Sequence, residues 1–112
     1  MIVVAPYDAY DCKGLIKSSI RNNNPVCYLE NELMYSREFD ISEDFWNEDY
    51  IVEIGKAKIM KEGNDVTIAA FSRMVGVALE AAEILEKEGI NVEVINLRSL
   101  KPLDRETIIK SV

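Results

Sequence analysis

The sequence predicts an α/β protein with a parallel strand–helix–strand unit in its second half. Short apolar runs rich in β-branched residues alternate with segments of helical periodicity, which is typical of α/β folds. Residues 65–97 contain a strand, a helix and a second strand, and a helical connection of this kind joins parallel strands by a right-handed crossover. Residues 1–30 show the same order of elements. The composition, 48% hydrophobic and 29% charged, is that of a folded domain.

The first strand and helix are marked by signals at their ends. The apolar run "MIVVAP" stops at Pro6, and Asp8 follows as a candidate helix N-cap. Apolar residues then recur at helical spacing, so residues 8–21 are expected to form one amphipathic helix.

The next strand, "PVCYLE" (25–30), is rich in β-branched and aromatic residues and is expected to be buried. Glu30 and Glu32 have the spacing that places two carboxylates on one face of a strand. Such a pair could act as a general acid and base or bind a cation. A solvated strand end explains the two residues equally well.

Three consecutive asparagines, Asn22 to Asn24, separate the helix from this strand. A helix C-terminus leaves carbonyl groups without intrahelical partners. Asn tolerates left-handed backbone angles better than other non-glycine residues, so "RNNNP" could reverse the chain sharply and direct several carbonyl oxygens toward one point. Such a cluster would suit a hard cation. A plain helix terminator is the simpler interpretation of the same residues.

An acidic segment follows the strand. Residues 29–53 contain nine carboxylates and one arginine, a net charge of −8, so the rest of the chain sums to +1 within the total of −7. The pattern is irregular apart from a possible helical turn begun by Ser42. Segments of this kind are most often solvated connectors held by their aromatic residues, and docking onto a basic partner is the less common alternative.

The second half of the chain contains candidate helix caps and candidate ligand-binding residues. Ser72 is placed to cap the helix of the strand–helix–strand unit, Gly89 to end it, and Asp104 to cap a last helix. Arg98 and Lys101 follow the carboxyl end of a parallel strand, where open α/β sheets bind ligands. Arginine suits a carboxylate or phosphate ligand, but a surface pair between Arg98 and Asp104 is the commoner outcome.

Composition excludes several classes of function. The negative charge argues against nucleic-acid binding, and no apolar run is long enough to span a membrane. The chain has no histidine to complete a zinc cluster or a catalytic dyad with Cys12 or Cys27, which are expected to be reduced thiols. The glycines are scattered singly, so no glycine-rich phosphate loop is predicted.

Four segments, in order and at compatible spacing, resemble the β subunits of the pyruvate dehydrogenase component, closest to the mitochondrial and alpha-proteobacterial type. They are "APYDAYDCKGLIKSSIRNNNPVCYLENELMY", "IGKAKIMKEGNDVTI", "VGVALEAAEILEKEG" and "EVINLRSLKPLDRETI". The resemblance implies thiamine diphosphate-dependent oxidative decarboxylation of pyruvate, with acetyl transfer to lipoyl groups and formation of acetyl-CoA. It implies three partners: an α subunit, a second β subunit and dihydrolipoyl acetyltransferase. The compartment would be the mitochondrial matrix, or the cytoplasm of a bacterium.

The resemblance also implies how the chain divides. Residues 1–35 would be the C-terminal part of a pyrimidine-binding domain, 36–55 an acidic linker, and 56–112 the N-terminal part of a transketolase C-terminal-like domain. In this family, the glutamate that bonds the aminopyrimidine ring and the active-site histidine precede the stretch that matches "IVVAPY". The thiamine diphosphate ligands would therefore lie outside this chain, with Mg²⁺ bound through the α subunit. The chain alone is expected to be an inactive fragment.

One site of the family is expected inside the chain. These β subunits bind a potassium ion largely through main-chain carbonyls at the turn after the first helix, which corresponds to Ser19, Ile20, Asn22 and Asn24. The family usually has Asp at the position of Asn22 and Ala at that of Ser19, so carbonyl ligation is kept while one carboxylate is lost. The ion would brace the subunit at a distance from the thiamine chemistry.

Two alternatives remain. The β subunits of branched-chain 2-oxoacid and acetoin dehydrogenases share this architecture, and turnover of pyruvate against 2-oxoisovalerate separates them. A non-catalytic interaction module, built from the acidic segment and the strand–helix–strand unit, would instead capture partners unrelated to these complexes.

Overall fold

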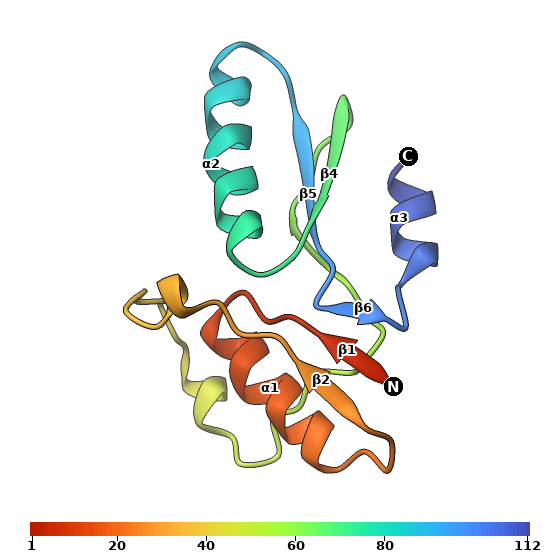
Figure 1. Cartoon of the computed structure of the whole chain (residues 1–112). Coiled ribbons are helices and arrows are strands. Elements are labelled where there is room, and N and C mark those ends of the chain that lie inside the picture. Colours follow the sequence, from red (N-terminus) through yellow and green to blue (C-terminus); the bar gives the residue numbers. More distant parts are fainter.

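The computed structural model describes all 112 residues and contains two three-stranded sheets (Figure 1). The strands are β1 (Ile2–Val4), β2 (Val26–Tyr28), β3 (Lys58–Lys61), β4 (Val66–Ala70), β5 (Val92–Asn96) and β6 (Ser99–Lys101). The helices are α1 (Ala9–Ile20), α2 (Arg73–Lys87) and α3 (Arg105–Ser111), with 3-10 turns η1 (Glu32–Met34) and η2 (Glu43–Trp46). The α/β prediction is confirmed. None of the helices is long and apolar enough to cross a membrane.

The first sheet has the strand order β2-β1-β6. β1 pairs with β2 in parallel, as expected for strands joined through α1, and pairs with β6 in antiparallel orientation. Val4, Leu15 and Val52 form the buried core between this sheet, α1 and the end of the acidic segment. The strand β6 comes from the second half of the chain, so this sheet contains strands from both ends of the sequence.

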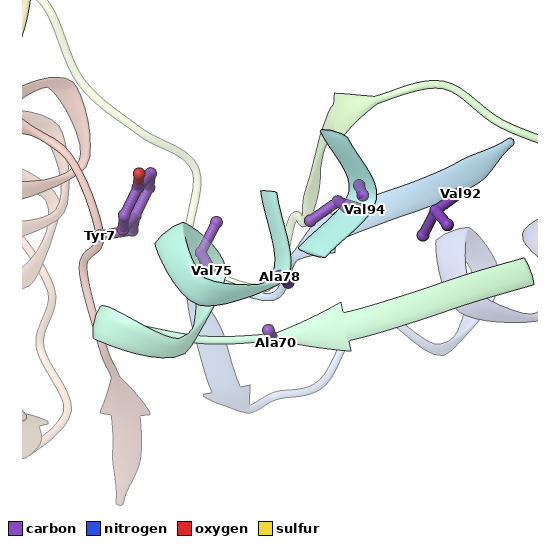
Figure 2. Close-up of a cluster of buried hydrophobic side chains, with 7 residues drawn as sticks. Tyr7, Ala70, Val75, Ala78, Val92 and Val94 are labelled. Atoms are coloured by element: carbon purple, nitrogen blue, oxygen red, sulfur yellow. The ribbon is translucent and has the colours of Figure 1, made fainter. Parts of the chain in front are cut away.

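The second sheet has the order β3-β5-β4, and its parallel pair is the predicted unit. β4 and β5 run in parallel with Val66 opposite Val92 and Ala70 opposite Asn96, and α2 crosses between them. The buried cluster under α2 includes one residue of the first half, Tyr7, whose side chain lies beside Val75 (Figure 2). The two halves therefore share a core.

Most of the predicted helix ends are confirmed. The Asp8 carboxylate accepts a hydrogen bond from Asp11 N at 2.7 Å, and the Asp104 carboxylate accepts one from Thr107 N at 3.2 Å. Gly89 follows α2 with φ 84°, the left-handed conformation that glycine adopts without strain. Ser42 precedes η2 as expected, but its hydroxyl makes no cap bond to the turn.

The prediction that the Ser72 side chain caps α2 was wrong. Ser72 has φ 49° and makes no side-chain hydrogen bond to the first turn of α2. The carbonyl of Phe71 accepts from Met74 N at 3.2 Å instead, so a backbone group performs the capping.

Candidate functional site

The turn after α1 is the predicted cation site. The asparagines do not take left-handed backbone angles, contrary to the prediction. The side-chain oxygen of Asn22 instead accepts hydrogen bonds from the backbone N (2.9 Å) and the side-chain N (3.1 Å) of Asn24. This Asx turn reverses the chain without a left-handed residue.

Carbonyl oxygens of this turn are available to a cation. Those of Ile20, Asn22 and Asn24 accept no backbone hydrogen bond, and that of Ser19 accepts one from Asn22 N at 3.2 Å. The hydroxyl of Ser19 donates to Leu15 O at 2.7 Å, so its carbonyl alone can serve as a ligand. Oxygen atoms at the negative end of a helix dipole suit a hard cation. The residues present fit such an ion, and the four-ligand assignment stays a prediction.

Side chains offer no other metal site. No group of three or more cysteine, aspartate or glutamate side chains is placed to hold a metal ion. Cys12 and Cys27 are both free thiols, as expected.

Glu30 and Glu32 do not share a strand face. β2 ends before them, and Glu32 opens η1, where the Asn31 side chain caps the turn. The prediction was wrong because this local side-chain bond competes with continuation of the strand. Glu30 instead accepts a hydrogen bond from the Tyr35 hydroxyl at 2.8 Å, which raises the pKa of Tyr35. The two carboxylates therefore do not form an acid–base pair.

A buried polar cluster joins the two halves of the chain. The carboxylate of Asp11, on α1, is fully buried and accepts hydrogen bonds from Arg98 Nε (2.6 Å), Asn96 Nδ2 (2.7 Å) and Tyr7 N (3.2 Å). Asn96 ends β5 and is also fully buried, and Arg98 follows it in the link to β6. We call Asp11, Asn96 and Arg98 the polar joint.

The expected surface pair between Arg98 and Asp104 is absent. The Arg98 backbone has φ 57°, and its guanidinium is bonded to Asp11 instead. Hydrogen bonds from the Thr107 hydroxyl (2.7 Å) and from Ala57 N (3.0 Å) hold the pKa of Asp104 below its usual value. Both side chains are therefore occupied by other partners. Neither Arg98 nor Lys101 lines any of the five pockets of the structure.

Asp8 is a second carboxylate close to the polar joint. It is largely buried, and its side chain lies 4.0 Å from Lys58 Nζ. Burial, and then the negative charge of Asp11, raise the pKa of Asp8 above its usual value. The charged form of Asp8 is therefore disfavoured in the folded protein.

A groove of about 270 Å³ opens between the start of α1 and residues 30–39. Six of its ten lining residues are hydrophobic: Tyr7, Ala9, Cys12, Met34, Tyr35 and Phe39. The guanidinium of Arg37 lies 5.7 Å from the ring centroids of both Tyr7 and Phe39, and its Nη2 lies 4.0 Å from Glu80. Arg37 thus holds the acidic segment against Tyr7, which precedes α1, and against Glu80 in the middle of α2.

Sequence reasoning missed the polar joint. Asp11 falls within the helix expected over residues 8–21, and Asn96 falls near the end of the strand–helix–strand unit expected over residues 65–97, and neither position suggested a contact between the two. Their contact spans 85 residues of sequence. One signal was available, because a polar residue that ends a continuous buried strand needs a hydrogen-bonding partner.

The chain is similar in sequence to a known domain family and to the subunits of a known enzyme. Residues 55–112 match the family described as "Transketolase, C-terminal domain". Curated relatives include the mitochondrial pyruvate dehydrogenase E1 component subunit β of Dictyostelium discoideum (57% identical), of Pisum sativum (58%) and of Homo sapiens (52%). Each alignment covers 98% of this chain and 31% of the relative. The resemblance seen in the sequence is confirmed, and the chain spans less than a third of the length of these relatives.

Solved structures give the same fold. A structure titled "Split gene transketolase, inactive beta4 tetramer" matches with TM-score 0.77 and 36% identity, over 99% of this chain and 35% of that chain. A transketolase of Pichia stipitis, in complex with sedoheptulose-7-phosphate, matches with TM-score 0.60 and 18% identity over 88% of this chain and 14% of that chain, which shows likeness of fold. The family match covers more than half of the chain, and the chain belongs to the transketolase C-terminal domain family.

Proposed function

We propose that this chain is a segment of the β subunit of a pyruvate dehydrogenase E1 component. The observation that carries the proposal is identity of 52–58% to such subunits over 98% of the chain. In the intact assembly the reaction would be oxidative decarboxylation of pyruvate, with acetyl transfer to lipoyl groups. The partners would be an α subunit, a second β subunit and dihydrolipoyl acetyltransferase. The compartment would be the mitochondrial matrix, and the names of the relatives, which say that they are mitochondrial, support a mitochondrial location.

No thiamine diphosphate ligand is proposed on this chain. The chain has no histidine and no glycine-rich loop, and its buried carboxylates, Asp8, Asp11 and Asp104, are engaged within the fold. When bound in the assembly, thiamine diphosphate supplies the carbanion-stabilising chemistry, and its Mg²⁺ would be held through the α subunit. The role of this chain would be structural: it would hold the turn after α1 and the sheet β3-β5-β4 in place within the subunit. The chain alone should turn over no pyruvate.

A chimera tests this proposal. The matching segment of the Pisum sativum subunit, 58% identical, is replaced by this chain and produced together with its α subunit. The chimera should assemble with the α subunit and turn over pyruvate in preference to 2-oxoisovalerate. Preference for 2-oxoisovalerate would favour a branched-chain enzyme, and failure to bind the α subunit, with capture of unrelated partners, would favour an interaction module. A chimera with Glu83→Gln, an exposed residue of α2 without an ion-pair partner, is the matched control.

We further propose that the turn after α1 binds potassium through the carbonyls of Ser19, Ile20, Asn22 and Asn24. Its support is the position of these carbonyl oxygens at a helix C-terminus, where those of Ile20, Asn22 and Asn24 accept no backbone hydrogen bond. Potassium favours rings of carbonyl oxygens, and a bound ion stabilises the folded state by mass action.

Thermal unfolding in KCl, NaCl and choline chloride at equal ionic strength measures this effect. The melting temperature should be highest in KCl, and Asn22→Asp should enlarge the potassium-specific difference because it adds a carboxylate. Asn47 forms the same kind of Asx bond, accepting from Asp49 N at 2.9 Å, so Asn47→Asp is the matched control and should not change the difference. Equal melting temperatures in KCl and choline chloride would contradict the assignment.

A further inference from the structure

A cavity of about 350 Å³ lies beside the turn after α1. Its walls come from two segments, the end of α1 with its turn and residues 51–54. The lining residues are Ser18, Arg21, Asn22, Ile51, Glu53 and Ile54. Asn22 is also one of the four residues whose carbonyls would bind potassium. The cavity therefore borders the candidate cation site.

Short contacts fix the two walls of this cavity against each other. The Ser18 hydroxyl donates a hydrogen bond to Val52 O at 2.6 Å. Val52 is 4% exposed and packs against Leu15 in the core of the first sheet. Because the chain is held at Val52, the next residue, Glu53, keeps its place in the wall of the cavity.

Two side chains of opposite charge line the cavity, the carboxylate of Glu53 and the guanidinium of Arg21. Neither takes part in an ion pair. The turn itself would offer the ion only neutral groups, because carbonyl oxygens and the Asn22 amide carry no formal charge. Apart from the partial negative charge of the helix end, the negative charge of the cavity is therefore that of Glu53.

We propose that Glu53 is the counter-charge of the potassium turn. Across the cavity, its carboxylate raises the affinity of the turn for the ion without replacing a carbonyl ligand, while the guanidinium of Arg21 lowers that affinity. Because the cavity is open to solvent, which screens both charges, each changes the affinity by a small factor. This inference rests on the proposed potassium site and adds which side chains set its affinity.

A potassium titration of the full 112-residue chain tests the proposal. The melting temperature is followed while KCl replaces choline chloride at a constant total of about 0.1 M, where the screening length is about 10 Å. The KCl concentration that gives half of the rise in melting temperature measures the affinity. Glu53→Gln should raise this concentration roughly threefold, and Arg21→Gln should lower it roughly threefold.

Matched controls change the same charges away from the cavity. Glu48→Gln removes an exposed, unpaired carboxylate of the same acidic segment, and Arg73→Gln removes an exposed, unpaired guanidinium at the start of α2. Neither residue lines the cavity, so both variants should keep the native half-saturation concentration. Glu53→Gln combined with Arg21→Gln should also return close to the native value, because the two effects have opposite sign.

The outcomes separate this inference from the potassium site on which it rests. Equal melting temperatures of the native chain in the two salts would refute potassium binding, and the counter-charge with it. A native response to potassium that is unchanged in Glu53→Gln and in Arg21→Gln would refute the counter-charge alone. A shift in Glu48→Gln as large as that in Glu53→Gln would show that net charge sets the affinity, and would also overturn the role given to Glu53.

Discussion

Asp11→Asn should destabilise the chain by about 3 to 5 kcal/mol, the cost of removing one partner from a buried ion pair. The native carboxylate is fully buried and accepts three hydrogen bonds, from Arg98, Asn96 and Tyr7. Asparagine keeps the shape but replaces one acceptor oxygen by a donor NH₂, which must face another donor. It also leaves the Arg98 guanidinium, whose side chain is 13% exposed, without its counter-charge. Lost hydrogen bonding and an uncompensated charge act in the same direction.

Urea unfolding, followed by far-UV circular dichroism and by the fluorescence of Trp46, measures the effect. Trp46 is the only tryptophan and lies in the acidic segment, so its signal reports on the first half of the chain. Asp11→Asn combined with Arg98→Met removes both charges and should recover part of the loss. The control is Glu106→Gln, which breaks the exposed pair with Lys110 and should leave the urea midpoint nearly unchanged.

The reasoning is refuted if Asp11→Asn costs less than about 1 kcal/mol, or if the double variant is less stable than Asp11→Asn by the full cost of Arg98→Met alone. The second result would mean that the two side chains stabilise the fold independently, and that the polar joint does not act as a unit.

Three further changes have defined outcomes. Gly14→Ala should destabilise the chain by about 1 to 3 kcal/mol in urea unfolding, because its Cβ would clash with Val52 Cγ2 and would lie 2.7 Å from Val52 N. In Gly76→Ala the Cβ meets only the flexible end of Arg37, so this variant should be near neutral, and equal costs of the two variants would contradict this account. Asp8→Asn keeps a good N-cap. Because the pKa of Asp8 is raised, the native chain loses stability as pH rises through that pKa, so the variant should be more stable than the native chain at pH 7 and should lose this advantage below about pH 4. A stability difference between the two chains that does not change with pH would argue against this account. Asp104→Ala should lower the free energy of unfolding by about 1 kcal/mol at pH 7. Because the pKa of Asp104 is lowered, this loss, measured from urea midpoints, should shrink as pH falls through that pKa. A loss that persists in acid would exclude the carboxylate as its cause.

Local signals in the sequence were sufficient for the helices and for the parallel unit. Asp8 and Asp104 cap helices through bonds to N–H groups three residues ahead, and that geometry depends on neighbouring residues alone. The β4–α2–β5 unit follows from strand and helix periodicity and from the handedness of the crossover. The Glu30 and Ser72 predictions failed because a competing local bond, an Asn31 cap in one case and a backbone carbonyl in the other, replaced the expected one.

Contacts between distant segments could not be read from the sequence. β6 pairs with β1 so that Lys101 lies opposite Val3, and nothing in "RSLKP" distinguishes a strand of the first sheet from a loop of the second. The candidate cation site shows a different limit, which is local. Helix termination by the asparagines was local and predictable, but the availability of the Ile20 carbonyl depends on the Asx turn that Asn22 and Asn24 form.

The contacts that cross the predicted linker change how the division into domains should be understood. Residues 1–35 supply Tyr7 to the core under α2 and Asp11 to the polar joint, while the second half supplies β6 to the first sheet. Each half thus satisfies buried polar groups or apolar surface of the other, and an isolated half would expose them. Because the polar joint is at the N-terminal end of α1 and the candidate cation turn is at its C-terminal end, the second half of the chain fixes the helix on which that turn depends. A potassium ion at the turn and the Asp11–Arg98 pair would then brace the same helix from opposite ends, which gives the ion a structural role without any contact to reacting atoms.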